Sequence, residues 1–143
     1  MSSTQLSWEW LAGFFDGEGC ISVCRNNYKP GQDAQTIRLQ IHQKQIEILD
    51  EITEFIFAET GAVPYLGGKK CHSLQYTRQN DVIAILDKLI PYLRVKKEFA
   101  IEAHAYMSEI VRLYNEFGQK WRKHAESPVV PTRARLRAVG GEM

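Results

Sequence analysis

Residues 35–43 alternate between polar and apolar side chains, with Ile37, Leu39 and Ile41 at every second position. A period of two predicts a β-strand that buries one face in the core and leaves the other face exposed. The exposed face would carry Thr36, Arg38, Gln40 and His42.

Apolar residues recur at helical spacing in three other segments, 45–59, 80–90 and 97–117. Gly61 and Gly118 follow the first and last of these segments, and Pro91 follows the second, as is typical of helix ends. A shorter apolar helix is predicted to begin after Ser7, a preferred N-cap residue, and to run to about Asp16.

Short apolar runs bounded by turn residues predict strands at 20–29, 35–43, 63–67 and 71–78. Pro30-Gly31 and Gly67-Gly68 mark the turns of two hairpins. The resulting order is helix, two strands, helix, two strands, helix, helix. It predicts an α+β fold, αββαββα, with a four-stranded antiparallel sheet, helices on one face and an open face for a partner.

The first helix carries two glycines, Gly13 and Gly17, four positions apart. Each is worse than alanine in a helix by roughly 1 kcal/mol, so something outside the helix must compensate. Glycines at this spacing leave a bare face that lets two backbones approach closely, and no apolar run in the chain is long enough to span a membrane. We therefore expect a second copy of the same helix as the partner. The expected contact residues are Ala12, Gly13, Asp16 and Gly17.

The same helix ends on carboxylates, which are unfavourable at the negative end of a helix dipole by about 0.3 to 1 kcal/mol. If two copies cross at a two-fold axis, both copies of Glu18 come close together. Their repulsion predicts a divalent cation bound through oxygen ligands. The alternative is that Gly17 or Gly19 is a C-cap glycine, which would indicate only that the helix ends there.

Residues 11–19, Leu-Ala-Gly-Phe-Phe-Asp-Gly-Glu-Gly, resemble the LAGLIDADG motif. Gln43-Lys44 and the segment 91–96 resemble further landmarks in the expected order, so the resemblance covers about residues 7–117. The chain is similar to the LAGLIDADG homing endonucleases that carry one motif. In that family one motif implies a homodimer, and the fold implies open sheets that form a saddle on DNA. The positions identical to the motif are Leu11, Ala12, Gly13, Asp16 and Gly19.

The resemblance implies roles for a few residues in a magnesium-dependent hydrolysis of DNA. Glu18 matches the metal-binding acid of the family, and the Gly19 carbonyl would be a further ligand for Mg²⁺ or another divalent cation. Gln43 matches the polar residue that orients solvent near the metal. Lys96 matches the basic residue that assists the attacking water or offsets charge in the transition state.

The function that the resemblance implies is that of a site-specific homing endonuclease. Acting as a homodimer, it would hydrolyse both strands of a long, pseudo-palindromic DNA target. Two alternatives use the same fold: an RNA maturase that assists intron splicing, and a catalytically silent DNA-binding protein. A silent protein would tolerate loss of the acid at position 18, which this chain retains. Lys97 and Arg94 are alternatives to Lys96 for the catalytic cation.

The formal net charge is only +1, but the charges are distributed unevenly. Residues 19–44 contain four basic residues and one acidic residue, and residues 61–78 contain three basic residues and no acidic one. Acidic residues gather in the predicted helices at 45–59 and 97–117. If both basic segments belong to one sheet, its open face is positive and suits a nucleic acid.

The alternation assigns base-reading side chains to that open face, because a β-ribbon fits the major groove, where Arg, Gln and Asn pair with base edges. Lys69 and Lys70, at the turn of the second hairpin, are expected to contact phosphates. The predicted base-reading residues are Ser22, Cys24, Asn26 and Tyr28 on the first strand, Thr36, Arg38, Gln40 and His42 on the second, and Ser73, Gln75 and Thr77 on the fourth.

Length and composition predict one domain, which the resemblance implies is an endonuclease domain, residues 1–118. A basic extension follows, residues 119–143, which is either a solvated tail or a further DNA contact. The three cysteines have no CxxC spacing and match no zinc motif together with His42 and His72. The N-terminus is polar and has no secretory signal. We therefore expect a non-secreted protein, in an organelle (chloroplast or mitochondrion) or in a prokaryotic cytoplasm.

Overall fold

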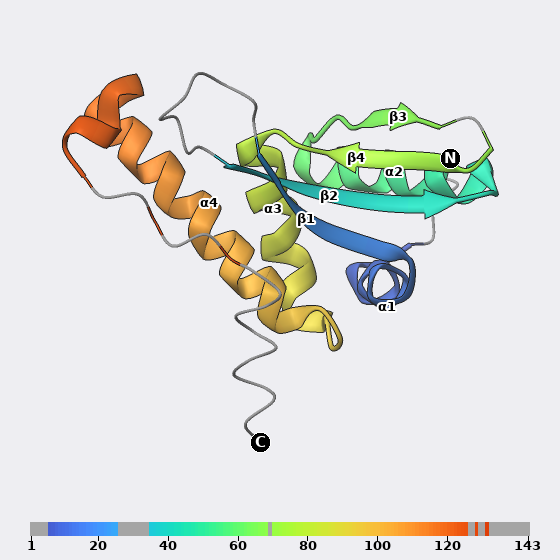
Figure 1. Ribbon diagram of the computed structural model, residues 1–143. Helices are drawn as coiled ribbons and strands as arrows, with labels where there is room; N and C mark the ends of the chain where they lie inside the picture. The colour runs from blue at the N-terminus through green and yellow to red at the C-terminus, as the bar shows by residue number, and fades with distance from the viewer. Residues whose placement is uncertain (1–5, 26–34, 69, 126–127, 129–130, 132–143) are drawn as a thin grey trace.

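The computed structural model describes residues 6–25, 35–68, 70–125, 128 and 131 of the 143-residue chain. The elements follow the predicted order, and the α+β fold is confirmed (Figure 1). No helix within the described ranges is long and apolar enough to cross a membrane. The elements are α1 (Trp8–Glu18), β1 (Gly19–Arg25), β2 (Gln35–Gln43), α2 (Ile46–Thr60), β3 (Tyr65–Gly67), β4 (His72–Tyr76), α3 (Gln79–Leu89), the 3₁₀ helix η1 (Ile90–Tyr92), α4 (Lys97–Phe117) and the 3₁₀ helix η2 (Gly118–Lys123).

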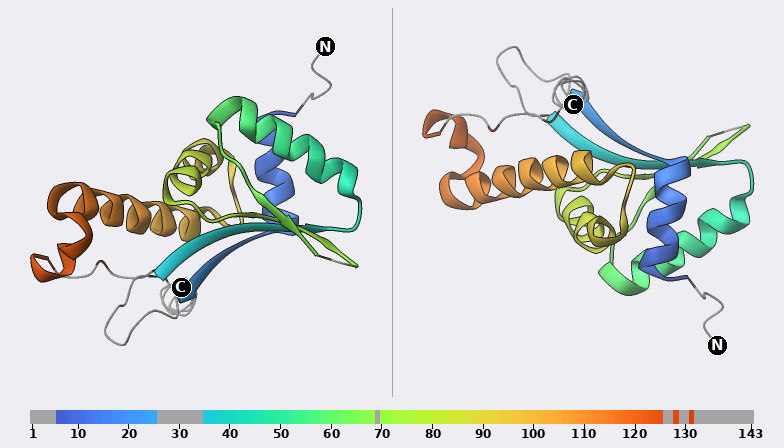
Figure 2. Two further views of the ribbon diagram at one scale, coloured as in Figure 1. Left: turned by 90° about the horizontal axis from the view of Figure 1, so that it is seen from above. Right: turned by 90° about the horizontal axis from the view of Figure 1, so that it is seen from below.

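The four strands form one antiparallel sheet in the order β1-β2-β4-β3. β2, which has the clearest alternation, is a central strand with neighbours on both sides, so burial of one face fixes its register. The sheet is curved, and α1 to α4 all lie on one side of it (Figure 2). The described elements therefore leave the other face of the sheet bare.

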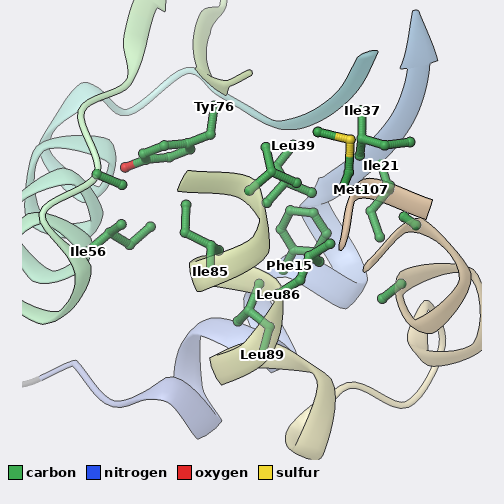
Figure 3. Close-up of a cluster of buried hydrophobic side chains, with 14 of the residues drawn as sticks. Phe15, Ile21, Ile37, Leu39, Ile56, Tyr76, Ile85, Leu86, Leu89 and Met107 are labelled. Atoms are coloured by element: carbon green, nitrogen blue, oxygen red, sulfur yellow. The ribbon is translucent and has the colours of Figure 1, made fainter. Parts of the chain in front are cut away.

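The core lies between the sheet and the helices (Figure 3). Ile37, Leu39 and Ile41 of β2 are at most 4% exposed, as the alternation predicts. Phe15 of α1 lies in the middle of this cluster, close to Leu39. Because Phe15 anchors α1 to the sheet, the residues that follow it at the end of α1 have a fixed position.

The buried side of α1 is formed by Leu11, Ala12 and Phe15. Gly13 and Gly17 are on the exposed side. Ala12 is 0% exposed, so the expectation that it belongs to a contact face with a second copy is wrong. Adjacent helical residues are about a quarter-turn apart, and this rotation is enough to turn Ala12 into the core of its own protomer.

Most of the predicted helix ends are confirmed. Ser7 Oγ accepts a hydrogen bond from Trp10 N at 3.0 Å, and Gly61 ends α2 in the left-handed conformation, with φ of 77°. α1 continues through Glu18, two residues beyond its expected end. After α4 the chain continues as η2, which the apolar pattern does not predict, and Trp121 of η2 is 1% exposed. The domain boundary at residue 118 stays a prediction, but the packed part of the protein reaches Trp121.

Candidate active site and nucleic-acid interface

The outer face of α1 is open at its two glycines. A Cβ atom added to Gly13 or to Gly17 would meet nothing within 4 Å. Beside Gly13 lies an open groove of about 620 Å³, whose lining includes Asp16, Arg94 and Lys97. No contact within the described protomer therefore requires glycine at position 13 or 17.

A contact inside the protomer explains why position 19, where α1 meets β1, is a glycine. Its φ of −90° suits any residue, but a Cβ atom here would overlap the Phe15 ring at Cδ1. The Phe15 ring is 2% exposed and is held by the core, so it cannot swing away. Glycine at position 19 lets the chain pass from α1 into β1 directly over this ring.

Asp16 fixes the loop that precedes α4. Its Oδ2 accepts a hydrogen bond from Arg94 N at 2.8 Å, and its Oδ1 accepts one from Lys96 N at 3.0 Å. Desolvation raises the pKa of Asp16, but the backbone N–H groups of Arg94, Lys96 and Val95, with the Lys96 charge, outweigh it, and the pKa is lowered. The carboxylate that seemed unfavourable at the end of a helix is therefore compensated within the chain. Although Asp16 lines the groove, its carboxylate oxygens are already engaged by this loop.

Lys96 is held through both its backbone and its side chain. Its Nζ donates a hydrogen bond of 2.6 Å to Asp16 O, a carbonyl in the last turn of α1. The negative end of the helix dipole favours an ammonium group there. Arg94 and Lys97, the alternatives for the catalytic cation, line the groove beside Gly13 instead. Of these three cations, Lys96 is the one whose charged atom is bonded to the end of the motif helix.

Gln43 ends β2 near the same junction. Gly19 pairs with Ile41 in the sheet, so β2 runs two residues past the start of β1. Gln43 Oε1 accepts hydrogen bonds from Lys44 N at 2.9 Å and from Gln45 N at 3.4 Å, which fixes the side chain just before α2 begins. Within the described residues its Nε2 group makes no hydrogen bond, and it can hold a water molecule.

Glu18 is the exposed carboxylate at the end of α1. In the part of the chain that the structure describes, it makes no hydrogen bond or ion pair, and no three His, Cys, Asp or Glu side chains are grouped so that they could hold a metal ion. One protomer thus offers a cation a single carboxylate. Mg²⁺ is commonly bound through one or two carboxylates together with substrate phosphates and water. The donor set fits Mg²⁺ if further oxygen ligands come from a second copy and from DNA.

The bare face of the sheet carries the polar side chains that the alternation assigns to it. Ser22 pairs with Arg38 across β1 and β2, and Gln40 pairs with Gln75 across β2 and β4, so three strands contribute to one surface. None of the four strands contains an acidic residue, whereas α2, in the helix layer, exposes several. The expected separation of charge between the two layers is confirmed for the described elements.

Ser73 supports this surface from below. It is 6% exposed, and its Oγ accepts hydrogen bonds from Gln40 Nε2 at 2.9 Å and from Gln75 Nε2 at 3.0 Å. The expectation that Ser73 reads bases directly is therefore corrected, because its short side chain is covered by two longer ones. Each glutamine uses an N–H group in this contact and keeps its Oε1 atom as an acceptor for a ligand.

The structure describes some of the remaining residues that are predicted to contact DNA, but not all of them. Cys24 is in β1 opposite Thr36 of β2. Three residues are exposed: His42, Lys70 and Thr77, the last of which lies one residue beyond β4. Three others lie outside the described residues: Asn26, Tyr28 and Lys69.

Two residues of the bare face were not predicted. Cys20 pairs with Gln40 and so shares its face, with Sγ 3.4 Å from Ser22 Oγ. Tyr65 of β3 pairs with Gln75 and is 67% exposed. Extending the alternation of the first strand by one step would have found Cys20. Tyr65 could be found only from the pairing of β3, because a proline and two glycines obscure its alternation.

A sequence profile described as LAGLIDADG endonuclease matches residues 11–108. The match begins at the first residue of the nonapeptide and extends into α4, so it spans more than half of the chain. The chain belongs to the LAGLIDADG endonuclease family. Family membership confirms the resemblance carried by residues 11–19. A search of curated proteins finds no significant match.

Solved structures show the same fold in homing endonucleases of this kind. I-TnaI matches with a TM-score of 0.60 and 20% identity, over 96% of this chain and 97% of that one. I-CvuI, crystallised with its target in the presence of calcium, matches with a TM-score of 0.61 and 18% identity, over 93% and 94% of the two chains. The LAGLIDADG homing endonuclease I-GzeII, in complex with a DNA target, matches with a TM-score of 0.65 and 13% identity, over 94% of this chain but 49% of that one. This family member therefore corresponds to the full length of two relatives and to half of the third.

Proposed function

We propose that the protein is a site-specific DNA endonuclease that acts as a homodimer and requires Mg²⁺ or another divalent cation. The observation that carries the proposal is the outer face of α1. Among the described residues, no contact explains the two glycines on this face, and the exposed carboxylate of Glu18 that follows them has no hydrogen-bond or ion-pair partner. Both features are unfavourable in an isolated helix. A second copy of α1 and a shared cation account for both.

The dimer contact is proposed to run through Gly13 and Gly17. Helices that cross closely need positions without side chains at the crossing, and two-fold interfaces are the commonest among homo-oligomers. The groove of about 620 Å³ beside Gly13 provides space for side chains of the second copy. The full-length matches to I-TnaI and I-CvuI, set against the half-length match to I-GzeII, support a one-motif chain that needs a partner.

The cation is proposed to be held by Glu18, with the Gly19 carbonyl as a second oxygen ligand and with phosphate oxygens of the substrate. A bound Mg²⁺ would supply Lewis-acid stabilisation of the phosphate and a more acidic water molecule. I-CvuI has been crystallised with DNA in the presence of calcium and, separately, of magnesium, which supports a divalent cation of this type. Because one protomer offers a single carboxylate, affinity for Mg²⁺ without DNA is expected to be weak.

Lys96 and Gln43 are proposed to act beside Glu18. Lys96 Nζ carries a positive charge at the end of α1, where it can offset the negative charge that develops on the scissile phosphate. Gln43 is fixed through its Oε1 atom, so its Nε2 group can hold the attacking water by a hydrogen bond. The proposal thus draws on three elements of the fold: the end of α1, the end of β2 and the loop before α4.

The bare sheet face is proposed to bind DNA in the major groove. Arg38 lies on this face opposite Ser22, and Gln40 and Gln75 retain their acceptor atoms. Arg pairs with guanine and Gln with adenine in the major groove. Two copies of this face related by a two-fold axis would read a pseudo-palindromic site, because the symmetry of the protein is mirrored in the target.

Cleavage of DNA by the purified protein tests the proposal. A duplex target is first selected from a randomised pool by binding to the wild-type protein in Ca²⁺, and it is then incubated with the protein in Mg²⁺ or in excess chelator. We expect cutting of both strands in Mg²⁺ and none in chelator. Sedimentation of the free protein should give the mass of a dimer.

The matched variants are Glu18→Gln and, as a control, Glu54→Gln on the exposed surface of α2. The first should bind the selected duplex without cutting it, and the second should cut as the wild type does. Cutting by Glu18→Gln at the wild-type rate, cutting in chelator, or the absence of any cutting by the wild-type protein would each overturn the proposal.

A further inference from the structure

We propose that Asp16 is a positioning residue for DNA cleavage, which holds the loop of residues 94–96 so that the Lys96 ammonium stays at the C-terminal end of α1. The inference rests on the proposed function, because the proposed DNA substrate provides the phosphate on which Lys96 acts. It concerns a residue of the motif that the proposed metal site leaves unused.

Three hydrogen bonds form a closed clamp between Asp16 and the loop. The carboxylate accepts hydrogen bonds from Arg94 N at 2.8 Å and from Lys96 N at 3.0 Å. In the opposite direction, Lys96 Nζ donates a hydrogen bond to Asp16 O at 2.6 Å. The loop lies between η1 and α4 and has no regular secondary structure. Asp16 therefore supplies the backbone contacts that a strand or helix would otherwise provide.

The clamp joins elements that bear opposite charge. Asp16 O belongs to the negative end of α1, and Glu18 adds a second carboxylate two residues later. Lys96 is the N-cap residue of α4, whose N-terminal end is positive, so the Asp16 carboxylate is favoured beside it. The arrangement orients the Lys96 side chain toward α1, and Lys96 is not among the residues that line the groove with Arg94 and Lys97.

Holding Lys96 in this way matters because lysine is a flexible side chain with four rotatable bonds. A catalytic charge lowers a barrier most when it is in position before the reaction begins. Asp16 anchors the backbone of Lys96 and, through its own carbonyl, the ammonium as well. Without the carboxylate, the loop would lose both backbone contacts at once.

A double-mutant cycle of Asp16→Asn and Lys96→Gln, measured by single-turnover cleavage of the selected duplex in Mg²⁺, tests this inference. Asparagine has the shape of aspartate but replaces one acceptor by a donor, so it cannot accept from both N–H groups. We expect Asp16→Asn to slow cleavage by about 10²-fold, the effect of a misplacement of roughly 1 Å. The Kd for the duplex in Ca²⁺ should not change. The double variant should be no slower than Lys96→Gln alone, since Asp16 acts through Lys96.

Controls separate this role from a general loss of structure. Asp50→Asn on the exposed surface of α2 removes the same charge and should cut at the wild-type rate. Asp16→Glu keeps the charge and should recover part of the rate lost in Asp16→Asn, and thermal melts verify that each variant is folded at the assay temperature. Wild-type cleavage by Asp16→Asn, or an equal further loss when it is added to Lys96→Gln, overturns the inference alone. A wild-type protein that cuts no duplex overturns the proposed function, and the inference with it.

Discussion

The last four residues of the motif form two pairs. Contacts within the protomer explain the residue types of one pair but not those of the other. Asp16 and Gly19, the inward pair, are explained inside the protomer: Asp16 holds the loop at 94–96, and Gly19 leaves room for the Phe15 ring. Gly17 and Glu18, the outward pair, have neither a close neighbour nor a bonded partner among the described residues.

One short segment therefore meets two kinds of requirement. The inward pair builds the corner where α1, β1 and the loop before α4 meet, so substitutions there should change the stability of the protomer. The outward pair is exposed and available to partners, so substitutions there should change function without destabilising the protomer. Measurements that find the reverse would remove the distinction.

Glu18→Gln has the largest expected effect, and the effect should be confined to cleavage. Loss of a metal-binding carboxylate removes Lewis-acid stabilisation worth several kcal/mol, so the single-turnover rate should fall by about 10³-fold or more. The free energy of unfolding in urea should stay at the wild-type value, because Glu18 makes no hydrogen bond or ion pair in the described protomer. The variant should still bind DNA in Ca²⁺. A variant that unfolds more readily than the wild type would move Glu18 into the inward pair.

Gly13→Leu tests the exposed glycine face one turn before the outward pair. A leucine at a close helix crossing would be present twice in a two-fold dimer, and overpacking of 1 to 3 kcal/mol per site predicts a dimer weakened by about 10²-fold or more. Sedimentation should show monomers, and cleavage should be lost with the dimer. Ala58→Leu places a leucine at an exposed position of α2 and should leave the dimer unchanged. A Gly13→Leu protein that stays dimeric would place the subunit contact elsewhere.

The sequence predicted most reliably what is encoded by local periodicity. The bounds of β2 and α4, Gln35–Gln43 and Lys97–Phe117, agree with the structure because burial repeats at a fixed interval along each. Ala12 was assigned to the wrong face, since a small residue beside a glycine fits either side of a helix. The contacts of Asp16 could not be foreseen, because its partners are 78 and 80 residues away in the chain.

In the candidate site, too, some residues could be predicted from the sequence and others could not. Glu18, Gln43 and Lys96 were indicated by the family resemblance, and their roles stay predictions. The support beneath the sheet surface had no sequence signal: Ser73 is 33 residues from Gln40, and its burial depends on two side chains that meet only across paired strands. Alternation assigns a face to a residue, but it does not tell which residues on that face lie underneath their neighbours.

Alanine at positions 17 and 19 should shift stability in opposite directions. Gly19→Ala forces a Cβ atom into the buried Phe15 ring, and overpacking of this kind costs about 1 to 3 kcal/mol. Gly17→Ala meets nothing and improves helix propensity, so it should stabilise the protomer by up to about 1 kcal/mol. Urea unfolding in the monomeric Gly13→Leu background removes the contribution of association. Equal effects at the two positions would contradict the division into pairs.

Asp16→Asn should destabilise the protomer modestly, and the pH dependence of this effect identifies its cause. The folded-state pKa of Asp16 is lowered, so its contribution is fully present above the unfolded pKa of about 3.9 and is lost as the pH falls through the lower folded value. Asp16 is partly exposed, and we expect the wild type to be more stable than Asp16→Asn by about 1 kcal/mol at pH 7. In urea titrations this difference should shrink below about pH 4.

The sign of that difference separates two physical accounts of the same carboxylate. If only the helix dipole acted, removing a negative charge from the last turn of α1 would stabilise the protein. If the bonds to Arg94 N and Lys96 N dominate, the substitution destabilises it at pH 7 and loses its effect in acid. Asp50→Asn, an exposed change on α2, should show no such pH dependence. An Asp16→Asn protein that is more stable than the wild type at pH 7 would mean that the loop does not compensate Asp16, and Asp16 would then need a partner outside the protomer, as Glu18 does.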